Sequence, residues 1–210
     1  MSDLRRISEV LVAMNEKKVK ELVREALDKG VLAKEILNEG LIPGMDIVGE
    51  KMESGDMFIP EVLMSAKAMS AAVEILKPLL GDEGITAAGK VVIGTVKGDL
   101  HDIGKNLVVM MLESAGFEVH NLGVDIGPED FVKAIKEKEP NLLALSALLT
   151  TTMSVMKQTI DAVTESGLRE RVKVMIGGAP VTQKFADEIG ADGYAPDAGS
   201  ANKLAKALLQ

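Results

Sequence analysis

The amino-terminal part of the chain has the hydrophobic periodicity of amphipathic helices. Between residues 3 and 80, apolar residues recur every three or four positions and never alternate as in a half-buried strand. Examples are Ile7, Val10, Leu11 and Met14, and later Leu63, Ala66, Met69 and Val73. The pattern predicts helices near residues 3–14, 16–29, 31–38, 41–53 and 60–79, punctuated by Gly30, Gly40 and Ser54-Gly55-Asp56. Helices of this kind predict a small bundle.

The carboxyl-terminal part alternates short aliphatic runs with amphipathic stretches. The runs at 91–95, 119–122, 142–146 and 172–176 predict strands, and Tyr194 marks a fifth. The stretches near 104–115, 128–138, 153–166, 182–189 and 198–209 predict helices. Apolar strands joined by helices predict a parallel sheet that is covered on both faces. We therefore expect an α/β protein in which a helical bundle precedes a flavodoxin-like domain with a five-stranded parallel sheet.

Residues 81–89, with the sequence GDEGITAAG, separate these two patterns. The segment has three glycines and no apolar cluster, which is typical of an exposed linker. A chain of 210 residues with 47% hydrophobic content is long enough for one large core or two modest ones. The pattern favours two: a helical domain over residues 1–80, the linker over 81–89, and a Rossmann-like domain over 90–210.

Composition excludes several classes of function. The formal charge of -8 and the lack of a dense basic run argue against nucleic acid as a partner, and aromatic residues, only 2% of the chain, offer little for base stacking. The absence of cysteine excludes disulfides, thiolate metal sites and a cysteine nucleophile. No apolar run is long enough to span a membrane, and the start MSDLRRISEV is too charged for a signal peptide. We expect a cytoplasmic protein.

The segment after the first predicted strand carries the most distinctive chemistry. It contains Asp99 and His101, followed by Gly104 at the start of the next helix. A carboxylate can take the proton of one imidazole nitrogen and leave the other free as a metal ligand or base. A glycine at the helix start permits close approach of a bulky ligand. His120, in contrast, lies inside a predicted strand with no partner nearby in sequence, so packing or exposure is its expected state.

Two further strand ends have unusual sequences. The third strand is followed by a turn rich in hydroxyl groups, from Ser146 to Thr152, and the fourth by Gly177-Gly178. Parallel strands bring their carboxyl ends to one edge of the sheet, where ligands bind in such folds. The three strand ends together suit a ligand that coordinates the histidine and pushes a flat group between backbones. Taken singly, the glycines could form a simple turn and the hydroxyls could cap a helix.

These elements resemble the motif of cobalamin-binding domains that hold the cofactor base-off with histidine on the metal. The motif is Asp-x-His-x-x-Gly, 41 residues, Ser-x-Leu, 28 residues, Gly-Gly, and this chain matches it at Asp99, His101, Gly104, Ser146, Leu148, Gly177 and Gly178. The helical part, with Met57-Phe58-Ile59-Pro60 before its last helix, resembles the cap that precedes this domain in methionine synthase. The whole chain is most similar to the small corrinoid proteins of methanol and methylamine demethylation systems.

The resemblance implies a corrinoid cofactor with specific residue roles. It makes His101 the lower axial ligand of cobalt, with Asp99 on its other nitrogen and the Thr152 hydroxyl behind Asp99. Methionine synthases have serine at the position of Thr152. The resemblance implies that cofactor-binding residues also include Phe58, on the upper face, and Gly104, Ser146, Leu148, Thr150, Gly177 and Gly178, around the nucleotide tail. No residue is expected to act as a free acid or base on substrate.

The implied function is that of a methyl carrier. One partner, a substrate-specific methyltransferase, would load the cobalt, and a second would transfer the methyl group to a folate or a thiol. A reductive activator is a further expected partner, and the chain itself is expected to be a non-catalytic corrinoid subunit. The alternatives are a cobalamin-sensing regulator, the cobalamin-binding subunit of a mutase, and a flavodoxin-like signalling domain without cobalt. The last alternative leaves the three matched strand ends unexplained.

Overall fold

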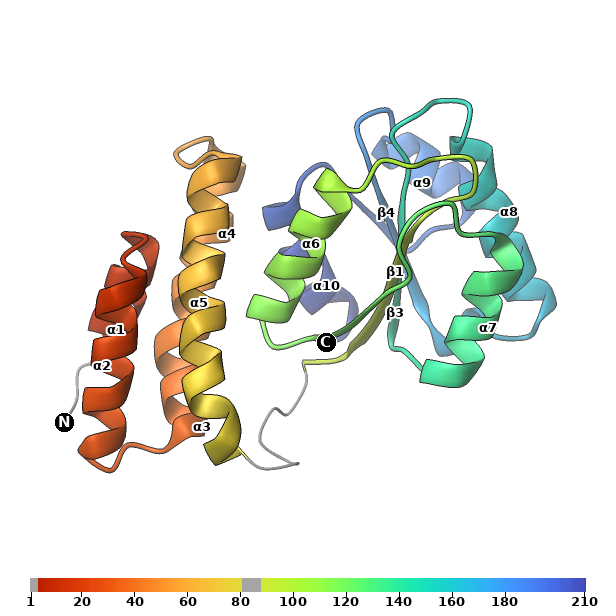
Figure 1. Cartoon of the computed structure of the whole chain (residues 1–210). Coiled ribbons are helices and arrows are strands. Elements are labelled where there is room, and N and C mark those ends of the chain that lie inside the picture. The colour runs from red at the N-terminus through yellow and green to blue at the C-terminus, as the bar shows by residue number, and fades with distance from the viewer. Residues whose placement is uncertain (1–3, 81–87) are drawn as a thin grey trace. The chain divides into compact units, whose positions relative to one another are not determined.

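The computed structural model describes residues 4–80 and 88–210 of the chain (Figure 1). These residues form two compact units. The helical unit comprises residues up to 87 together with Ser114–Gly116, and the sheet unit comprises Ala88–Glu113 and Phe117–Gln210. The predicted linker over 81–89 lies for the most part outside the described residues. Each unit is described below by itself.

The helical unit is built from α1 (Arg5–Val12), α2 (Glu16–Asp28), α3 (Ala33–Glu35), η1 (Ile36–Leu41), α4 (Ile42–Ser54) and α5 (Ile59–Leu80). Local signals set several of these ends. The Asn15 side chain accepts a hydrogen bond from the Lys18 N–H at the start of α2, and Gly55 ends α4 in the left-handed conformation. The apolar positions of the predicted periodicity, such as Ile7, Leu11 and Val19, are buried.

The segment around Gly40 differs from the prediction. Gly40 does not separate two helices but lies inside η1, a π-helical stretch that runs directly into α4. The Ser8 hydroxyl donates a hydrogen bond to the Gly40 carbonyl oxygen, and a Cβ at Gly40 would lie 3.5 Å from Ile7 Cβ. A Cβ there would make only ordinary van der Waals contacts, so the hydrogen bond from Ser8, between residues 32 apart in the chain, is what ties this stretch to α1.

The helical spacing of the methionines at positions 45, 52, 57, 64 and 69 predicts that they fill the core of this unit. Met52 is half-buried. Met45, Met57 and Met69 are buried. Met64 is 54% exposed, so the prediction is wrong for that residue. The helical spacing placed Met64 correctly in α5 but could not show which arc of that helix faces its neighbours.

The sheet unit alternates strands and helices along the chain. The strands are β1 (Lys90–Thr95), β2 (Glu118–Asn121), β3 (Leu142–Ser146), β4 (Lys173–Gly177) and β5 (Gly193–Ala195). The helices are α6 (Ile103–Ser114), α7 (Pro128–Lys138), α8 (Met153–Glu165), η2 (Arg169–Arg171), α9 (Gln183–Ile189) and α10 (Ala198–Leu208). All strands pair in parallel in the order β2-β1-β3-β4-β5, with Thr95 opposite Ser146 and Ser146 opposite Gly177. The predicted fold class is confirmed, and the register brings the ends of β1, β3 and β4 side by side.

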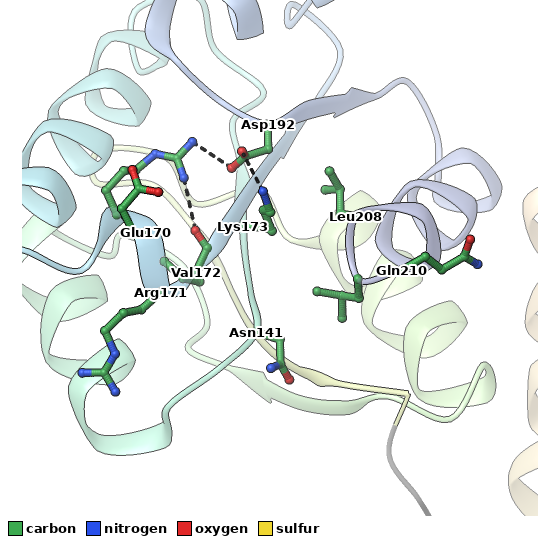
Figure 2. A pocket seen from close by; sticks show the side chains of 10 residues that line it. Asn141, Glu170, Arg171, Val172, Lys173, Asp192, Leu208 and Gln210 are labelled. Carbon is green, nitrogen blue, oxygen red and sulfur yellow. Dashed lines mark hydrogen bonds and ion pairs between the residues drawn. The ribbon is translucent and has the colours of Figure 1, made fainter.

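The amino ends of the strands form the opposite edge of the sheet. A cavity of about 490 Å³ opens there beside η2, the start of β4 and the end of α10 (Figure 2). Its main polar feature is Asp192, which accepts hydrogen bonds from Arg169 Nη2 at 2.8 Å and from the Val174 N–H at 2.7 Å. Arg169 also donates to the carbonyl oxygens of Val172 and Gly190. Asp192 and Arg169 are thus paired with each other and with backbone groups of the chain.

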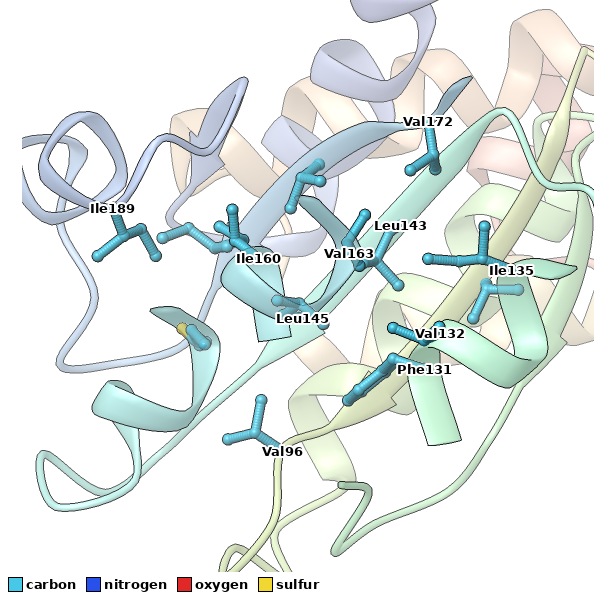
Figure 3. Packing of buried hydrophobic residues seen from close by; sticks show 14 of the residues in the cluster. Val96, Phe131, Val132, Ile135, Leu143, Leu145, Ile160, Val163, Val172 and Ile189 are labelled. Carbon is cyan, nitrogen blue, oxygen red and sulfur yellow. The ribbon is translucent and has the colours of Figure 1, made fainter. Parts of the chain in front are cut away.

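Helices cover both faces of the sheet (Figure 1). One face packs against α7, α8 and α9 in a single hydrophobic cluster that includes Phe131, Leu143 and Ile160 (Figure 3). Alternate strand residues such as Val91 and Leu142 are buried outside that cluster, and α6 and α10 lie on the other face. Burial on both faces explains why the strands read as continuous aliphatic runs. Within the described residues no helix is both long and apolar enough to cross a membrane.

Candidate functional site

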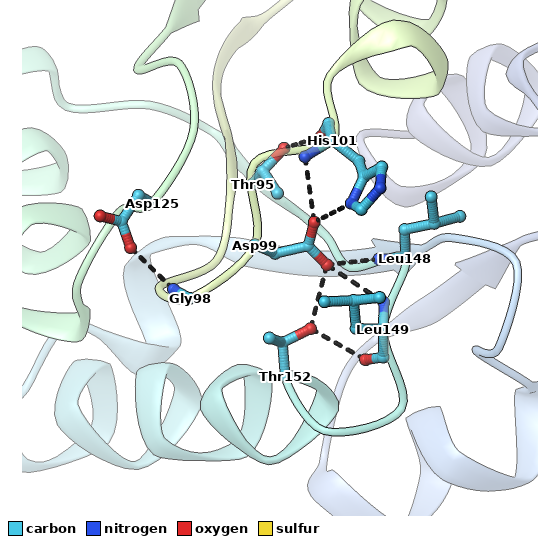
Figure 4. Close-up of polar contacts among 8 residues, drawn as sticks. All are labelled: Thr95, Gly98, Asp99, His101, Asp125, Leu148, Leu149 and Thr152. Atoms are coloured by element: carbon cyan, nitrogen blue, oxygen red, sulfur yellow. Dashed lines mark hydrogen bonds and ion pairs between the residues drawn. The ribbon is translucent and has the colours of Figure 1, made fainter.

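Asp99 is the centre of a polar network at the carboxyl edge of the sheet (Figure 4). It lies in the β1 loop, which we define as residues 96–102, and its side chain is fully buried. One carboxylate oxygen, Oδ1, accepts hydrogen bonds from the His101 N–H at 3.0 Å and from His101 Nδ1 at 2.8 Å. The other oxygen, Oδ2, accepts from the N–H groups of Leu148 at 2.7 Å and Leu149 at 3.1 Å and from Thr152 Oγ1 at 3.0 Å. Each carboxylate oxygen of Asp99 therefore accepts two or three hydrogen bonds from the protein.

The network keeps Asp99 ionised. Burial on its own would raise the pKa of Asp99, because a buried carboxylate loses its hydration. Hydrogen bonds from His101 and from two N–H groups of the β3 loop, residues 147–152, outweigh burial and hold this pKa well below its ordinary range. A permanent carboxylate fixes the proton of the imidazole on Nδ1 and leaves Nε2 as the nitrogen with a free lone pair.

His101 is held at its backbone as well as at its ring. Its N–H donates to Asp99, and its carbonyl oxygen accepts a hydrogen bond of 2.9 Å from the hydroxyl of Thr95, a fully buried residue. The ring is nevertheless 53% exposed, and Nε2 makes no hydrogen bond to any described residue. A fixed, half-exposed ring whose Nε2 is not engaged by the described residues is the arrangement of a ligand for a single metal coordination position.

Exposed aliphatic side chains occur in the β1 loop, at the first residue of α6 and in the β3 loop. Leu100 is 72% exposed, Ile103 77%, Leu148 43% and Leu149 41%. Large aliphatic residues are rarely grouped on a monomer surface without a function. They offer an apolar surface beside the imidazole. Three of them, Leu100, Ile103 and Leu149, were not predicted as site residues. Their position next to the motif residues, in a loop or at the first residue of a helix, was the available signal.

The glycine pair after β4 is required by the chain itself. Gly178 has a φ of +127°, and a Cβ there would lie 1.9 Å from the carbonyl oxygen of Ala147. A Cβ at Gly177 would lie 2.9 Å from the carbonyl oxygen of Ala195. The lack of side chains therefore lets the ends of β3, β4 and β5 approach one another. This packing accounts for both glycines, and their predicted role toward a cofactor tail stays a prediction.

The other predicted site residues fall into two groups. Ser146, Thr150 and Gly104 lie on the same sheet edge, and a Cβ at Gly104 would meet nothing within 4 Å. Phe58 belongs to the helical unit, where its ring is 69% exposed. No hydrogen bond engages the hydroxyls of Ser146 or Thr150 among the described residues. Their assignments as cofactor-binding residues stay predictions.

Sequence reasoning missed two residues that hold the β1 loop. Thr95 supplies the hydroxyl that fixes His101, and its burial at the last position of β1 was a weak signal. Asp125, in the loop after β2, accepts a hydrogen bond of 2.7 Å from the Gly98 N–H, and nothing in the sequence indicated that contact. The prediction that His120 lacks a nearby partner is wrong, since its Nε2 lies 3.0 Å from Glu118 Oε1.

The donor set fits a cofactor that brings most of its own ligands. Among the described residues no group of three or more His, Cys, Asp or Glu could hold a bare metal ion. One imidazole beside an apolar surface suits a metal that is already bound in a planar macrocycle and lacks one axial ligand. The side chains present thus fit a corrinoid.

Comparison with known families agrees with this chemistry. A B12 binding domain family matches residues 89–202, and a second B12 binding domain family matches residues 3–77. The sheet unit with its His101 loop and the helical unit are therefore both typical of B12-binding proteins.

Individual relatives resemble the chain over nearly its whole length. Dimethylamine corrinoid protein 3 of Methanosarcina acetivorans is 44% identical over 206 residues, which cover 98% of this chain and 96% of that protein. A cobalamin-binding protein of Desulfitobacterium hafniense has a crystal structure with a TM-score of 0.87 at 35% identity, covering 99% of both chains. The structure of the methanol:cobalamin methyltransferase complex of Methanosarcina barkeri gives a TM-score of 0.84 at 32% identity, covering 97% of this chain and 78% of that one. The chain belongs to the B12-binding family of corrinoid proteins, which confirms the resemblance seen in its sequence.

Proposed function

We propose that this protein is the methyl carrier of a corrinoid-dependent methyltransferase system, with a methylated amine as the class of methyl donor. The observation that carries the proposal is the half-exposed His101 ring, fixed by the buried Asp99 with Nε2 left free. The donor class is supported by the similarity to a dimethylamine corrinoid protein over 98% of the chain. The bound corrinoid supplies a cobalt atom that can accept a methyl group and give it up.

The proposed task of the β1 loop is to hold and tune the lower side of that cobalt. His101 would coordinate through Nε2, with the cofactor bound base-off. The anionic Asp99 on Nδ1 makes the imidazole a stronger donor, because it stabilises positive charge that develops on the ring. Thr152 and two backbone N–H groups keep the carboxylate in place. No residue acts on the methyl group as a free acid or base in this proposal.

The apolar side chains around His101 would pack against the macrocycle. Leu100, Ile103 and Leu148 each expose aliphatic surface that a flat ring can cover. Removing such surface from water contributes roughly 25 cal/mol per Å². The predicted roles of Ser146, Thr150, Gly177 and Gly178 toward the nucleotide tail, and of Phe58 on the upper face, belong to the same proposal.

The proposed partners follow from what the chain supplies. One methyltransferase specific for the donor would load the cobalt, a second would move the methyl group to a folate or a thiol, and a reductive activator would restore the cofactor after oxidation. All of these would be encountered in the cytoplasm. The net charge of -8 fits protein partners better than nucleic acid.

A visible absorption experiment tests the ligation. Hydroxocobalamin is added to the apo-protein of the wild type, of His101→Ala and of His120→Ala, the last being a matched control because the chain has only two histidines. We expect wild type and His120→Ala to give the same imidazole-ligated spectrum and His101→Ala to give a base-off spectrum without it. No binding to the wild type, or an unchanged spectrum in His101→Ala, would overturn the proposal.

A transfer experiment tests the donor class. Reduced holo-protein is incubated with methyl-labelled methylamines or methanol, each with its own purified methyltransferase. We expect label to reach the protein-bound corrinoid from a methylated amine and much less from methanol. Label from methanol alone would overturn the donor class, and label from neither donor would overturn the carrier function.

A further inference from the structure

The loop after β2, residues 122–127, runs beside the β1 loop and touches it at several points. The Thr95 N–H donates to the Gly123 carbonyl oxygen, and the Ile126 N–H donates to the Thr95 carbonyl oxygen, both at 3.0 Å. Val96 and Ile126 form an isolated parallel bridge. The end of β1 is therefore anchored to this loop by backbone contacts that any residue could make.

Asp125 makes two further hydrogen bonds to the β1 loop, at Gly98 and at Asp99. Its Oδ1 accepts a hydrogen bond of 2.7 Å from the Gly98 N–H (Figure 4), and its own N–H donates to the Asp99 carbonyl oxygen at 3.1 Å. Gly98 itself has a φ of +84°. One residue therefore holds the Lys97–Gly98 peptide through its N–H and the Asp99–Leu100 peptide through its carbonyl oxygen. It thus fixes the turn that contains Asp99, the residue that holds the His101 ring.

The backbone of Asp125 is unusual. Its φ is +60°, in the left-handed region that residues with a Cβ seldom adopt. Aspartate and asparagine tolerate this region better than other side chains, and such a conformation persists only where surrounding contacts hold it. The strained residue is exposed, so no packing requirement explains it. The two hydrogen bonds to the β1 loop are the contacts that hold it.

We infer that Asp125 is a positioning residue for His101, acting from outside the family motif through the Gly98 N–H and the Asp99 carbonyl oxygen. The inference rests on the proposed function, because it concerns the same cobalt ligand. Thr95 fixes the His101 peptide from one side, and Asp125 fixes the preceding turn from the other. Without the Asp125 acceptor the turn at Gly98 gains freedom, and the imidazole spends less time in the direction that coordination needs.

Two variants at position 125 separate positioning from charge and from folding. Asp125→Asn keeps an oxygen acceptor and tolerance of positive φ but removes the negative charge. Asp125→Gly tolerates positive φ best but removes the acceptor. Backbone contacts of Gly123 and Ile126 remain in both variants, so both are expected to fold. Neither variant alters a residue that touches the cofactor.

The measurement uses apo-protein and methylcobalamin-loaded protein. In apo-protein, exchange of the Gly98 amide hydrogen reports the contact directly. In loaded protein, the visible spectrum gives the ratio of histidine-ligated to unligated cobalt. We expect Asp125→Gly to speed Gly98 exchange and to lower that ratio by roughly tenfold, the loss expected for one hydrogen bond of ordinary strength, while Asp125→Asn stays within about twofold of the wild type.

The outcomes that overturn the inference are specific. If Asp125→Gly keeps the wild-type ligation ratio, Asp125 does not position His101. If the ratio of ligated to unligated cobalt falls as far in Asp125→Asn as in Asp125→Gly, the effect comes from the carboxylate charge and not from positioning. A wild-type protein that shows no histidine ligation overturns the proposed function instead, and the two failures are therefore distinguishable.

Discussion

The two edges of the sheet each contain a carboxylate that accepts several hydrogen bonds, and the two differ in what those bonds achieve. At the amino edge, Asp192 is paired with Arg169 at 2.8 Å and with Lys173 at 3.8 Å. At the carboxyl edge, Asp99 has no Lys or Arg partner among the described residues, and its only charged or chargeable partner is the half-exposed His101. The first arrangement neutralises a charge, and the second orients a titratable ring.

The difference separates structural polar networks from functional ones. Both edges contain a buried or half-buried acid, and the amino edge also has a cavity. Within the part of the chain that the structure describes, the carboxyl edge has an imidazole nitrogen that makes no hydrogen bond, together with exposed aliphatic side chains. A cavity whose charged groups are already satisfied offers little to a ligand, because binding would first have to break those pairs. A ligating nitrogen that makes no hydrogen bond to the described residues is therefore a better indicator of the ligand site than a cavity is.

Two glycines should give the largest contrast between the edges. Gly178 at the carboxyl edge and Gly190 at the amino edge both have positive φ, but a Cβ would lie 1.9 Å from Ala147 O at Gly178 and would meet nothing at Gly190. We expect Gly178→Ala to lower the free energy of unfolding by about 4 kcal/mol and Gly190→Ala by about 1 kcal/mol. Urea unfolding of both variants checks this. Equal losses would contradict the close approach of β3 and β4.

Removal of each carboxylate should separate stability from ligation. Asp99→Ala leaves buried donors unpaired and should lower the free energy of unfolding by about 3 kcal/mol, with loss of histidine ligation to added hydroxocobalamin. Asp192→Ala should lower it by about 2 kcal/mol, since it leaves Arg169 and the Val174 N–H without their acceptor. Its corrinoid spectrum should match the wild type. A changed spectrum in Asp192→Ala would show that the edges are coupled.

The stability of the apo-protein in acid should report Asp99. Because the folded-state pKa is below the ordinary value of about 3.9, the ionised carboxylate stabilises the fold above that value. This contribution is lost as the pH falls from about 4 toward the lower folded-state pKa. The difference in unfolding free energy between wild type and Asp99→Asn should therefore be constant from pH 7 to 5 and shrink below pH 4. A difference that grows in acid would contradict the lowered pKa of Asp99 in the folded protein.

Thr152 should give the smallest effect. Its hydroxyl donates to both Asp99 Oδ2 and the Leu149 carbonyl oxygen. Thr152→Val removes the hydroxyl at nearly constant volume and should cost about 1 kcal/mol, whereas Thr152→Ser keeps the donor and should cost less than half of that. Thermal unfolding measures both. The serine variant also tests whether threonine, where methionine synthases have serine, changes the histidine ligation.

The match between the predicted and observed fold has a simple physical origin. Strands buried on both faces must be continuously apolar, and helices packed on one side must repeat every three to four residues. Both rules act over a few neighbouring residues, so the alternation of strands and helices could be predicted together with the edge at which their loops gather. The π-helical η1 was missed because its hydrogen bond to α1, from Ser8 to Gly40, joins residues 32 apart, and local sequence does not record such a contact.

The local pattern predicted the two kinds of unit and the pairing of Asp99 with His101, because residues two apart in a loop are close in any compact conformation. The family resemblance implied the Thr152 hydroxyl behind that pair, whereas the N–H groups of Leu148 and Leu149 and the contact from Asp125 were seen only in the folded chain. The donors to Asp99 Oδ2 come from 49 to 53 residues further along the chain, and Asp125 meets Gly98 across 27 residues. Such contacts exist because the parallel register sets Thr95 opposite Ser146 and so fixes which residues of the loops after β1, β2 and β3 meet at the predicted edge. No local pattern encodes that register.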